Sequence, residues 1–137
     1  MTVEEKLRGL GIELRPLSKP VANYLHAKKF GNLIYCSGCA PVKDGKNLYT
    51  GKLGTDLTVE QGYDAAREAA INLLSVLKHE LGSLDRVTSI VKILGFVASA
   101  DDFYAQPAVI NGASDLLVEV FGEKGHHARA AIGTNAI

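Results

Sequence analysis

One amphipathic stretch between Thr58 and Gly82 most strongly limits how this chain can fold. Thr58 and Gln61 have the spacing of a capping box, which begins a helix, and the glycine at position 82 suits its end. A helix of about six turns with one apolar side must cover another layer of structure. The residues that recur at helical spacing on that side are Tyr63, Ala66, Ala70, Leu73, Leu74, Leu77 and Leu81.

The segments around this helix predict an α+β fold. Pro107 suits the first turn of a second amphipathic helix, which Gly122 ends. Because crossover connections between strands are right-handed, we expect both long helices on one face of a mixed sheet, as a two-layer sandwich. The expected strands cover residues 22–30 and 33–37, joined as a hairpin at Gly31-Asn32, then a short piece near 48–50, a long strand over 87–97 and a last one over 128–132.

A short helix of its own begins the chain. Thr2 and Glu5 form a second capping box, the helix covers Val3 to Leu10, and Gly11 suits its end. The 137 residues match the usual size of one domain. We therefore expect residues 1–15 to be a helical extension and residues 16–137 to be a single α+β domain.

The predicted strands are apolar on both faces. Along residues 33–36, Leu33 and Tyr35 alternate with Ile34 and Cys36, and the strand at 87–97 has the same character. If both helices cover one face, the other apolar face has no cover within the chain. We therefore expect a homo-oligomer that packs sheet against sheet, with a small-molecule site at the subunit boundary.

Charge and hydropathy disfavour two classes of partner. Fifteen Lys and Arg balance fifteen Asp and Glu, so strong binding to a nucleic-acid backbone is not expected. No apolar stretch reaches the roughly 18 residues of a membrane span. The first residues carry Glu4, Glu5 and Lys6 where a signal peptide is apolar, which predicts a cytoplasmic protein.

Several motifs are too weak to indicate a site. Cys36 and Cys39 have C-x-x-C spacing but no helix start or second pair beside them, so we expect reduced thiols. His126 and His127 are adjacent and would point to opposite faces of a strand, so no metal site is expected. Glycine patterns for nucleotide binding and the serine-hydrolase elbow are absent.

Arg129 is the charged residue that the expected scaffold explains least. It interrupts the apolar run of the last strand, and its permanent charge needs a partner. A guanidinium binds a carboxylate bidentately, so a small carboxylic acid is one interpretation, while an ion pair at a strand edge or subunit interface is the other. Ser37-Gly38 offers a hydroxyl and close backbone approach, and Tyr24 offers a phenol, although turn and core roles suit these residues as well.

Several of these segments together resemble the reactive intermediate deaminase family, also called Rid or YjgF-like. The resemblance spans about residues 16–132, and its most specific parts are the strand that ends at Ser37-Gly38 and the Ala128-Arg129 pair. The matching segments are Pro20-Val21-Ala22-Asn23-Tyr24, Gly31-Asn32-Leu33-Ile34-Tyr35-Cys36-Ser37-Gly38, Thr58 with Gln61, Phe96-Val97, Asp102-Phe103 and His127-Ala128-Arg129.

The resemblance implies a chorismate-mutase-like fold, a homotrimer with clefts between subunits, no cofactor, and hydrolysis of 2-imino or enamine acids to 2-keto acids and ammonia. It implies that Arg129 holds the substrate carboxylate, that Ala131 contributes backbone groups, and that Tyr24, Ser37 and Gly38 line the pocket. The family's polar residue on the second long helix corresponds to either Ser114 or Asp115. Family members also continue into a further strand with an acidic residue, beyond the region that ends here at Ile137.

Two other functions compete with the deaminase. A non-catalytic trimer could bind a small carboxylate metabolite in the same cleft and regulate or buffer it. RNA cleavage is a label often attached to this family, but the neutral net charge argues against strong RNA affinity.

Overall fold

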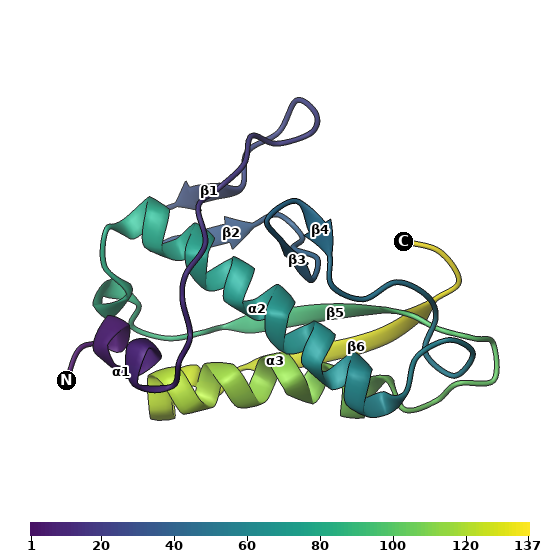
Figure 1. Cartoon of the computed structure of the whole chain (residues 1–137). Helices are drawn as coiled ribbons and strands as arrows, with labels where there is room; N and C mark the ends of the chain where they lie inside the picture. The colour runs from purple at the N-terminus through teal and green to yellow at the C-terminus, as the bar shows by residue number, and fades with distance from the viewer.

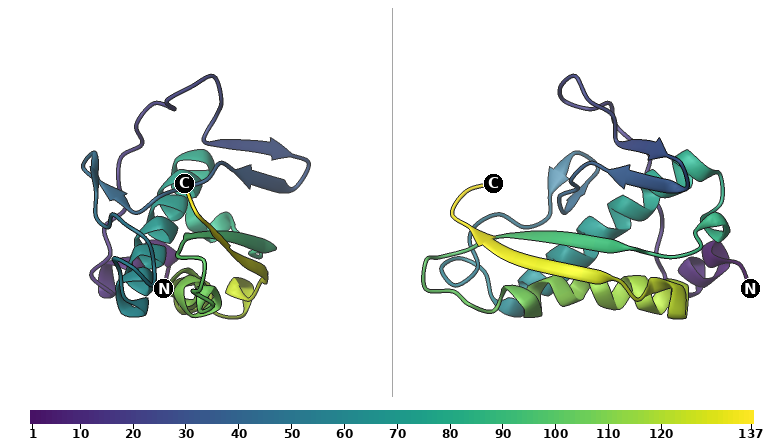
Figure 2. Two further views of the ribbon diagram at one scale, coloured as in Figure 1. Left: turned by 90° about the vertical axis from the view of Figure 1, so that its right-hand side faces the viewer. Right: turned by 180° about the vertical axis from the view of Figure 1, so that it is seen from behind.

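Two long helices form one layer of the protein, and two of the three strand pairs form the other (Figure 1). The computed structural model describes residues 1–137. Helix α2 (Val59–Leu81) and helix α3 (Gln106–Phe121) pack against each other on one face of the parallel strands β5 (Lys92–Ala98) and β6 (Ala128–Thr134) (Figure 2). The expected α+β sandwich with both long helices on one face is confirmed.

The helix boundaries follow from the capping residues. At α2, the Thr58 hydroxyl accepts from the Gln61 N–H and the Gln61 side chain accepts from the Thr58 N–H. Helix α1 (Val3–Gly9) has the same reciprocal cap from Thr2 and Glu5. Gly82 and Gly122 lie at the C-terminal caps of α2 and α3. These local signals therefore predicted all three α-helices.

The strands form three separate hydrogen-bonded pairs. Strands β1 (Ala27–Phe30) and β2 (Leu33–Cys36) are an antiparallel hairpin, and so are the short strands β3 (Val42–Lys43) and β4 (Lys46–Asn47). Strands β5 and β6 form the parallel pair. Both strand orientations occur, as expected, but ladder bonds do not join the pairs into one sheet. The β1–β2 hairpin lies on the opposite side of β5 from β6 (Figure 1).

Two predicted strands begin too early in the sequence. Residues 22–26 are not a strand, because the Tyr24 N–H bonds to the Ala22 carbonyl and bends the chain. The strand expected over 87–97 begins only at Lys92, which lies opposite Ala128, the first residue of its partner. Apolar character alone could not indicate where a partner strand begins.

The extended piece expected at 48–50 was wrong, because the strands form earlier, on both sides of Asp44-Gly45. Asp44 has φ +53° and Gly45 has φ +74°, the conformation of a two-residue type I′ hairpin turn. The sequence reveals the turn but not the two short strands that it joins.

The core lies mainly between the helices. Leu7 of α1, Leu74 of α2 and Leu116 of α3 are fully buried in one cluster, so α1 contributes to the same core as the long helices. The two long helices are in close contact at Gly112, where an added Cβ would lie 1.9 Å from the Tyr63 carbonyl oxygen. Only glycine allows this contact. None of the helices combines the length and hydrophobicity that a membrane crossing requires.

The strand face that points away from the helices is apolar and open. Leu94 and Phe96 of β5 are each 54% exposed, and Ile132 of β6 is 45% exposed. Their neighbour Val97 points to the helices and is buried in a second core cluster. Within a single chain, nothing covers this outer face.

Candidate functional site

Arg129 lies on β6 with its side chain directed at helix α3. It pairs in register with Ile93 of β5, and its Nη1 donates to Asn111 Oδ1 at 2.7 Å and to Ser114 Oγ at 3.2 Å. Asn111 and Ser114 lie three residues apart, so they share one face of α3. The parallel connection β5–α3–β6 places this helix beside the strand that carries the arginine.

Further hydrogen bonds extend from Arg129 through two more side chains. Ser114 Oγ lies 2.9 Å from His127 Nε2, and His127 Nδ1 lies 2.6 Å from the Gly125 carbonyl oxygen. A carbonyl only accepts, so Nδ1 carries a proton. In the tautomer that carries its single proton on Nδ1, Nε2 accepts from the Ser114 hydroxyl. The donors therefore run in one direction, from Arg129 to Ser114, then to His127 and to the Gly125 carbonyl.

The rest of the Arg129 guanidinium is free. Both protein bonds use Nη1, neither acceptor is charged, and Arg129 forms no salt bridge. Nη2 and Nε donate to no protein atom, and neither nitrogen is buried. The arginine is thus oriented by neutral groups and keeps an open edge for an anion.

A pocket of about 570 Å³ opens beside Arg129. Its two carboxylates have partners elsewhere: Asp115 accepts from the Tyr63 hydroxyl at 2.7 Å, and Glu119 pairs with Arg67 at 3.4 Å. The bond to Asp115 is the main reason that the pKa of Tyr63 is raised. The lining residues are Asn111, Ser114, Asp115, Val118, Glu119, His126, His127 and Arg129.

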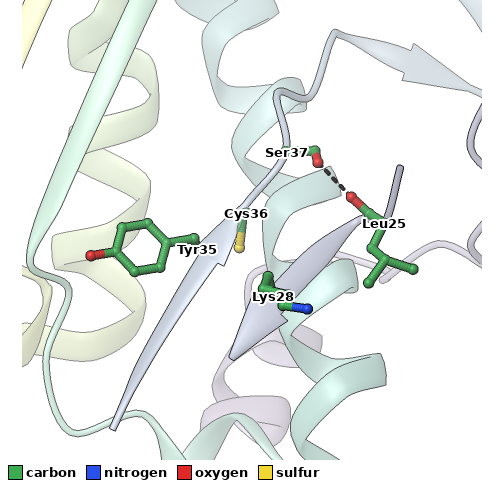
Figure 3. Close-up of a pocket in the computed structure, with 5 residues that line it drawn as sticks. All are labelled: Leu25, Lys28, Tyr35, Cys36 and Ser37. Carbon is green, nitrogen blue, oxygen red and sulfur yellow. Dashed lines mark hydrogen bonds between the residues drawn. The ribbon is translucent and has the colours of Figure 1, made fainter. Parts of the chain in front are cut away.

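Ser37 lies in a different pocket, of about 260 Å³, at the β1–β2 hairpin (Figure 3). Its N–H donates to the His26 carbonyl and its hydroxyl donates to the Leu25 carbonyl at 2.5 Å. Lys28 and Tyr35 line this pocket too, and neither was predicted from the sequence as a site residue. Gly38 follows directly, and a Cβ added there would meet nothing within 4 Å.

Tyr24 lines neither of these two pockets. It lies in the bent segment before β1. Within one chain, the predicted site residues are therefore not brought together: Ser37 lies at the hairpin, and Arg129 lies on β6 on the other side of β5 (Figure 1).

Ala131 shares the helix-facing side of β6 with Arg129, and its side chain packs against the second core cluster. The Ala128 N–H and the Thr134 carbonyl both bond toward β5. Backbone groups alternate along a parallel strand, so those of Ala131 point to the opposite edge. No strand pairs with that edge, so these groups are free for a ligand.

The sequence does not reveal Asn111 as a partner of Arg129 or His127 as a partner of Ser114, and it leaves Ser114 and Asp115 as alternatives. Ser114 contacts Arg129, whereas Asp115 contacts Tyr63. The detectable signal was the polar spacing of positions 111 and 114, which Asp115 and Glu119 continue along the same helix. Which strand this face meets depends on the tertiary structure.

The two cysteines are free thiols. Burial, with a smaller effect of the neighbouring Cys36, raises the pKa of Cys39 to about 11. Burial and the Glu80 carboxylate raise the pKa of Cys36 as well. Both shifts favour the protonated thiol, which is a poor nucleophile. No group of three or more His, Cys, Asp or Glu side chains is positioned to hold a metal ion.

Solved structures define the class of this protein by its fold. One described as a "putative endoribonuclease" of Shewanella oneidensis superposes with a TM-score of 0.97 at 36% identity, over 100% of this chain and 91% of that chain. The protein Atu1372 of Agrobacterium tumefaciens, described as of unknown function, has a TM-score of 0.91 at 42% identity, over 99% and 84% of the two chains.

The chain belongs to the YjgF family: the model described as "YjgF/chorismate_mutase-like, putative endoribonuclease" matches residues 4–137. Protein TCP17 of Trypanosoma cruzi is 43% identical over 132 residues, which cover 96% of this chain and 82% of TCP17. Protein HMF1 of Saccharomyces cerevisiae is 35% identical over 82 residues, 60% of this chain and 54% of HMF1. The expected family and its chorismate-mutase-like fold are confirmed.

Proposed function

We propose that this protein hydrolyses reactive 2-imino acids to 2-keto acids and ammonia, with the substrate carboxylate bound by Arg129. The observation that carries the proposal is the free edge of the Arg129 guanidinium, which neutral acceptors orient from one side only. A carboxylate that accepts from Nη2 and Nε would form a bidentate ion pair without displacing a protein partner.

The chemistry needs few catalytic groups. An imine carbon is already electrophilic, so holding the substrate and one water in the correct geometry lowers the barrier through proximity, by several kcal/mol out of a ceiling of about 7 to 11. The unpaired backbone edge at Ala131 lies two residues from Arg129 and offers groups that orient the imine or the water. No cofactor is required for this hydrolysis.

The proposal includes a homotrimer with the sites between subunits. Ser37 lines the pocket at the β1–β2 hairpin, and Arg129 of β6 lines the other pocket. The hairpin and β6 lie on different sides of β5 (Figure 1), so a head-to-tail ring would bring β6 of one chain to the hairpin of the next. Such a ring would also cover the exposed side chains of Leu94, Phe96 and Ile132. Sedimentation should give three times the chain mass of 14.6 kDa, and a monomer would contradict this assembly.

The test is hydrolysis of 2-iminopropanoate and 2-iminobutanoate, generated in the assay by an amino-acid oxidase. Wild type should accelerate keto-acid release, and Arg129→Ala should lower kcat/KM by roughly 10- to 100-fold, because it removes a charge-assisted bond pair. Arg86→Ala is the matched control, since this exposed arginine bonds only to the Leu81 carbonyl. No acceleration by folded, oligomeric wild type would contradict the proposal.

Two binding measurements, made beside the hydrolysis assay, separate the competing functions. Tight binding of 2-oxobutanoate without imine turnover would favour a non-catalytic carboxylate-binding protein. The family description and one structural relative carry the words "putative endoribonuclease", so RNA is tested as well. With no net charge, the chain should show little salt-dependent RNA binding. Cytoplasmic localisation stays a prediction, and one relative is named as mitochondrial.

A further inference from the structure

We propose that His127 is a positioning residue, which acts through Ser114 to fix the direction in which Arg129 presents its free edge. This inference rests on the proposed function, because it concerns the same carboxylate site. It assigns a role to a histidine that forms no hydrogen bond to Arg129 and, by this proposal, none to the substrate.

The geometry gives Ser114 two separate tasks. Its oxygen accepts from Arg129 Nη1 at 3.2 Å, and its own proton must be donated to another group. A serine within a helix can donate back to the carbonyl four residues earlier, which for Ser114 is that of Ile110. His127 Nε2 at 2.9 Å offers the alternative acceptor on the strand side. His127 therefore directs the hydroxyl so that its lone pairs face the guanidinium.

His127 itself is held by a rigid anchor. Its Nδ1 donates to the carbonyl of Gly125, a buried residue in the short 3₁₀ turn that follows α3. This turn packs tightly on α3, since an added Cβ at Gly125 would lie 2.2 Å from the Leu117 carbonyl oxygen. The bond to this carbonyl also fixes the tautomer that leaves Nε2 as the acceptor.

Arg129 needs this support because its partners are neutral. A carboxylate partner would hold the guanidinium by charge, as Glu68 does for Arg15, but Arg129 has only Asn111 and Ser114. Because both neutral acceptors bond to one nitrogen, the orientation of the guanidinium plane depends on the directions of these two hydrogen bonds. Loss of one directed acceptor should therefore weaken carboxylate binding more than it changes the chemical step.

The variants are Ser114→Ala, His127→Leu, His127→Gln and the double variant Ser114→Ala/His127→Leu. His79→Leu, an exposed histidine of α2, is the control. Each protein is assayed for kcat and KM with 2-iminobutanoate and for the Kd of 2-oxobutanoate by calorimetry. Thermal unfolding confirms that each variant is folded.

His127→Leu should raise KM and Kd roughly fivefold to tenfold, the size of one lost hydrogen bond, with kcat within about twofold of wild type. His127→Gln should restore both values to within about twofold, because its side-chain carbonyl can accept from Ser114. The double variant should be no weaker than Ser114→Ala alone, since His127 acts only through Ser114.

Three results would overturn the inference. These are wild-type KM and Kd in His127→Leu, a fall in kcat with unchanged KM, or additive losses in the double variant. If wild type binds 2-oxobutanoate but does not turn over the imine, the proposed function fails, and the Kd series alone decides the role of His127. If wild type neither binds nor turns over, both proposals fail.

Discussion

Arg15 and Arg129 are both half-buried and both bonded to a long helix, but their guanidinium groups are held differently. Arg15 uses both terminal nitrogens: Nη1 donates to α2 and to the Val42 carbonyl, and Nη2 pairs with Glu68. Arg129 uses one nitrogen and contacts no carboxylate. The Arg15 guanidinium is bonded through both terminal nitrogens and fastens the chain together, although its buried Nε has no partner. The Arg129 guanidinium keeps an open edge that is available to a ligand.

The serine beside each arginine repeats this difference. Ser75 is buried, accepts from the Arg15 backbone N–H at 2.9 Å and donates to the Ile71 carbonyl. Ser114 lines an open pocket and connects Arg129 with His127. The region around Arg15 attaches the N-terminal segment to α2, and the region around Arg129 faces the site. Stability should therefore depend on the first region and activity on the second.

The largest expected effect is on stability, from Arg15→Ala. The side chains of Arg15 and Glu68 are only 14% and 22% exposed, so the variant leaves a mostly buried carboxylate without its partner. The free energy of unfolding should fall by about 2 to 4 kcal/mol in urea titrations. Arg129→Ala should change the free energy of unfolding by less than about 0.5 kcal/mol. Equal losses of stability in the two variants would contradict the difference between the two regions.

The next largest effect is on activity, from Arg129→Lys. Lysine keeps the charge but cannot donate two parallel hydrogen bonds, so kcat/KM should fall roughly tenfold in the imine assay. Urea titration should show unchanged stability. Full activity in this variant would mean that charge alone suffices, and that the free edge of the guanidinium is not the reason for an arginine here.

Ser75→Ala should cost about 1 kcal/mol of stability, because the Arg15 backbone N–H loses its acceptor at a part-buried position. Ser114→Ala should cost less, since water can reach its pocket. Paired urea titrations of the two variants measure this difference directly. A reversed order would show that the Arg129 region also supports the fold.

The smallest effect is a pH dependence at α1. Burial raises the pKa of Glu4. The hydrogen bonds from the Leu84 N–H and from its own N–H, together with Lys78, lower the pKa by more than burial raises it, so the net shift is downward. A lowered pKa adds stability above the unfolded value of about 4.3, and this is lost as the pH falls through the folded pKa. Between about pH 5 and pH 3, the wild type should lose more stability than Glu4→Gln. Glu13→Gln is the control, because Glu13 is exposed and forms no salt bridge.

Local signals predicted much of the fold. The capping pairs at Thr2 and Thr58 and the glycines at 82 and 122 fixed the helices, since a cap acts within one turn of its own residue. The strand ends were harder to predict. The β5 strand begins where its partner begins, and that partner lies more than thirty residues later in the sequence.

For the candidate site, the sequence by itself determined the family pattern and the one unexplained charge, Arg129, because an arginine in an apolar strand is visible without a structure. Only the tertiary structure decided what surrounds that charge. The α3 face with Asn111 and Ser114 meets β6 through a parallel crossover, and His127 reaches Ser114 across the same contact. Hydrogen bonds need side chains within about 3 Å, and only folding brings residues so far apart in the chain to that distance.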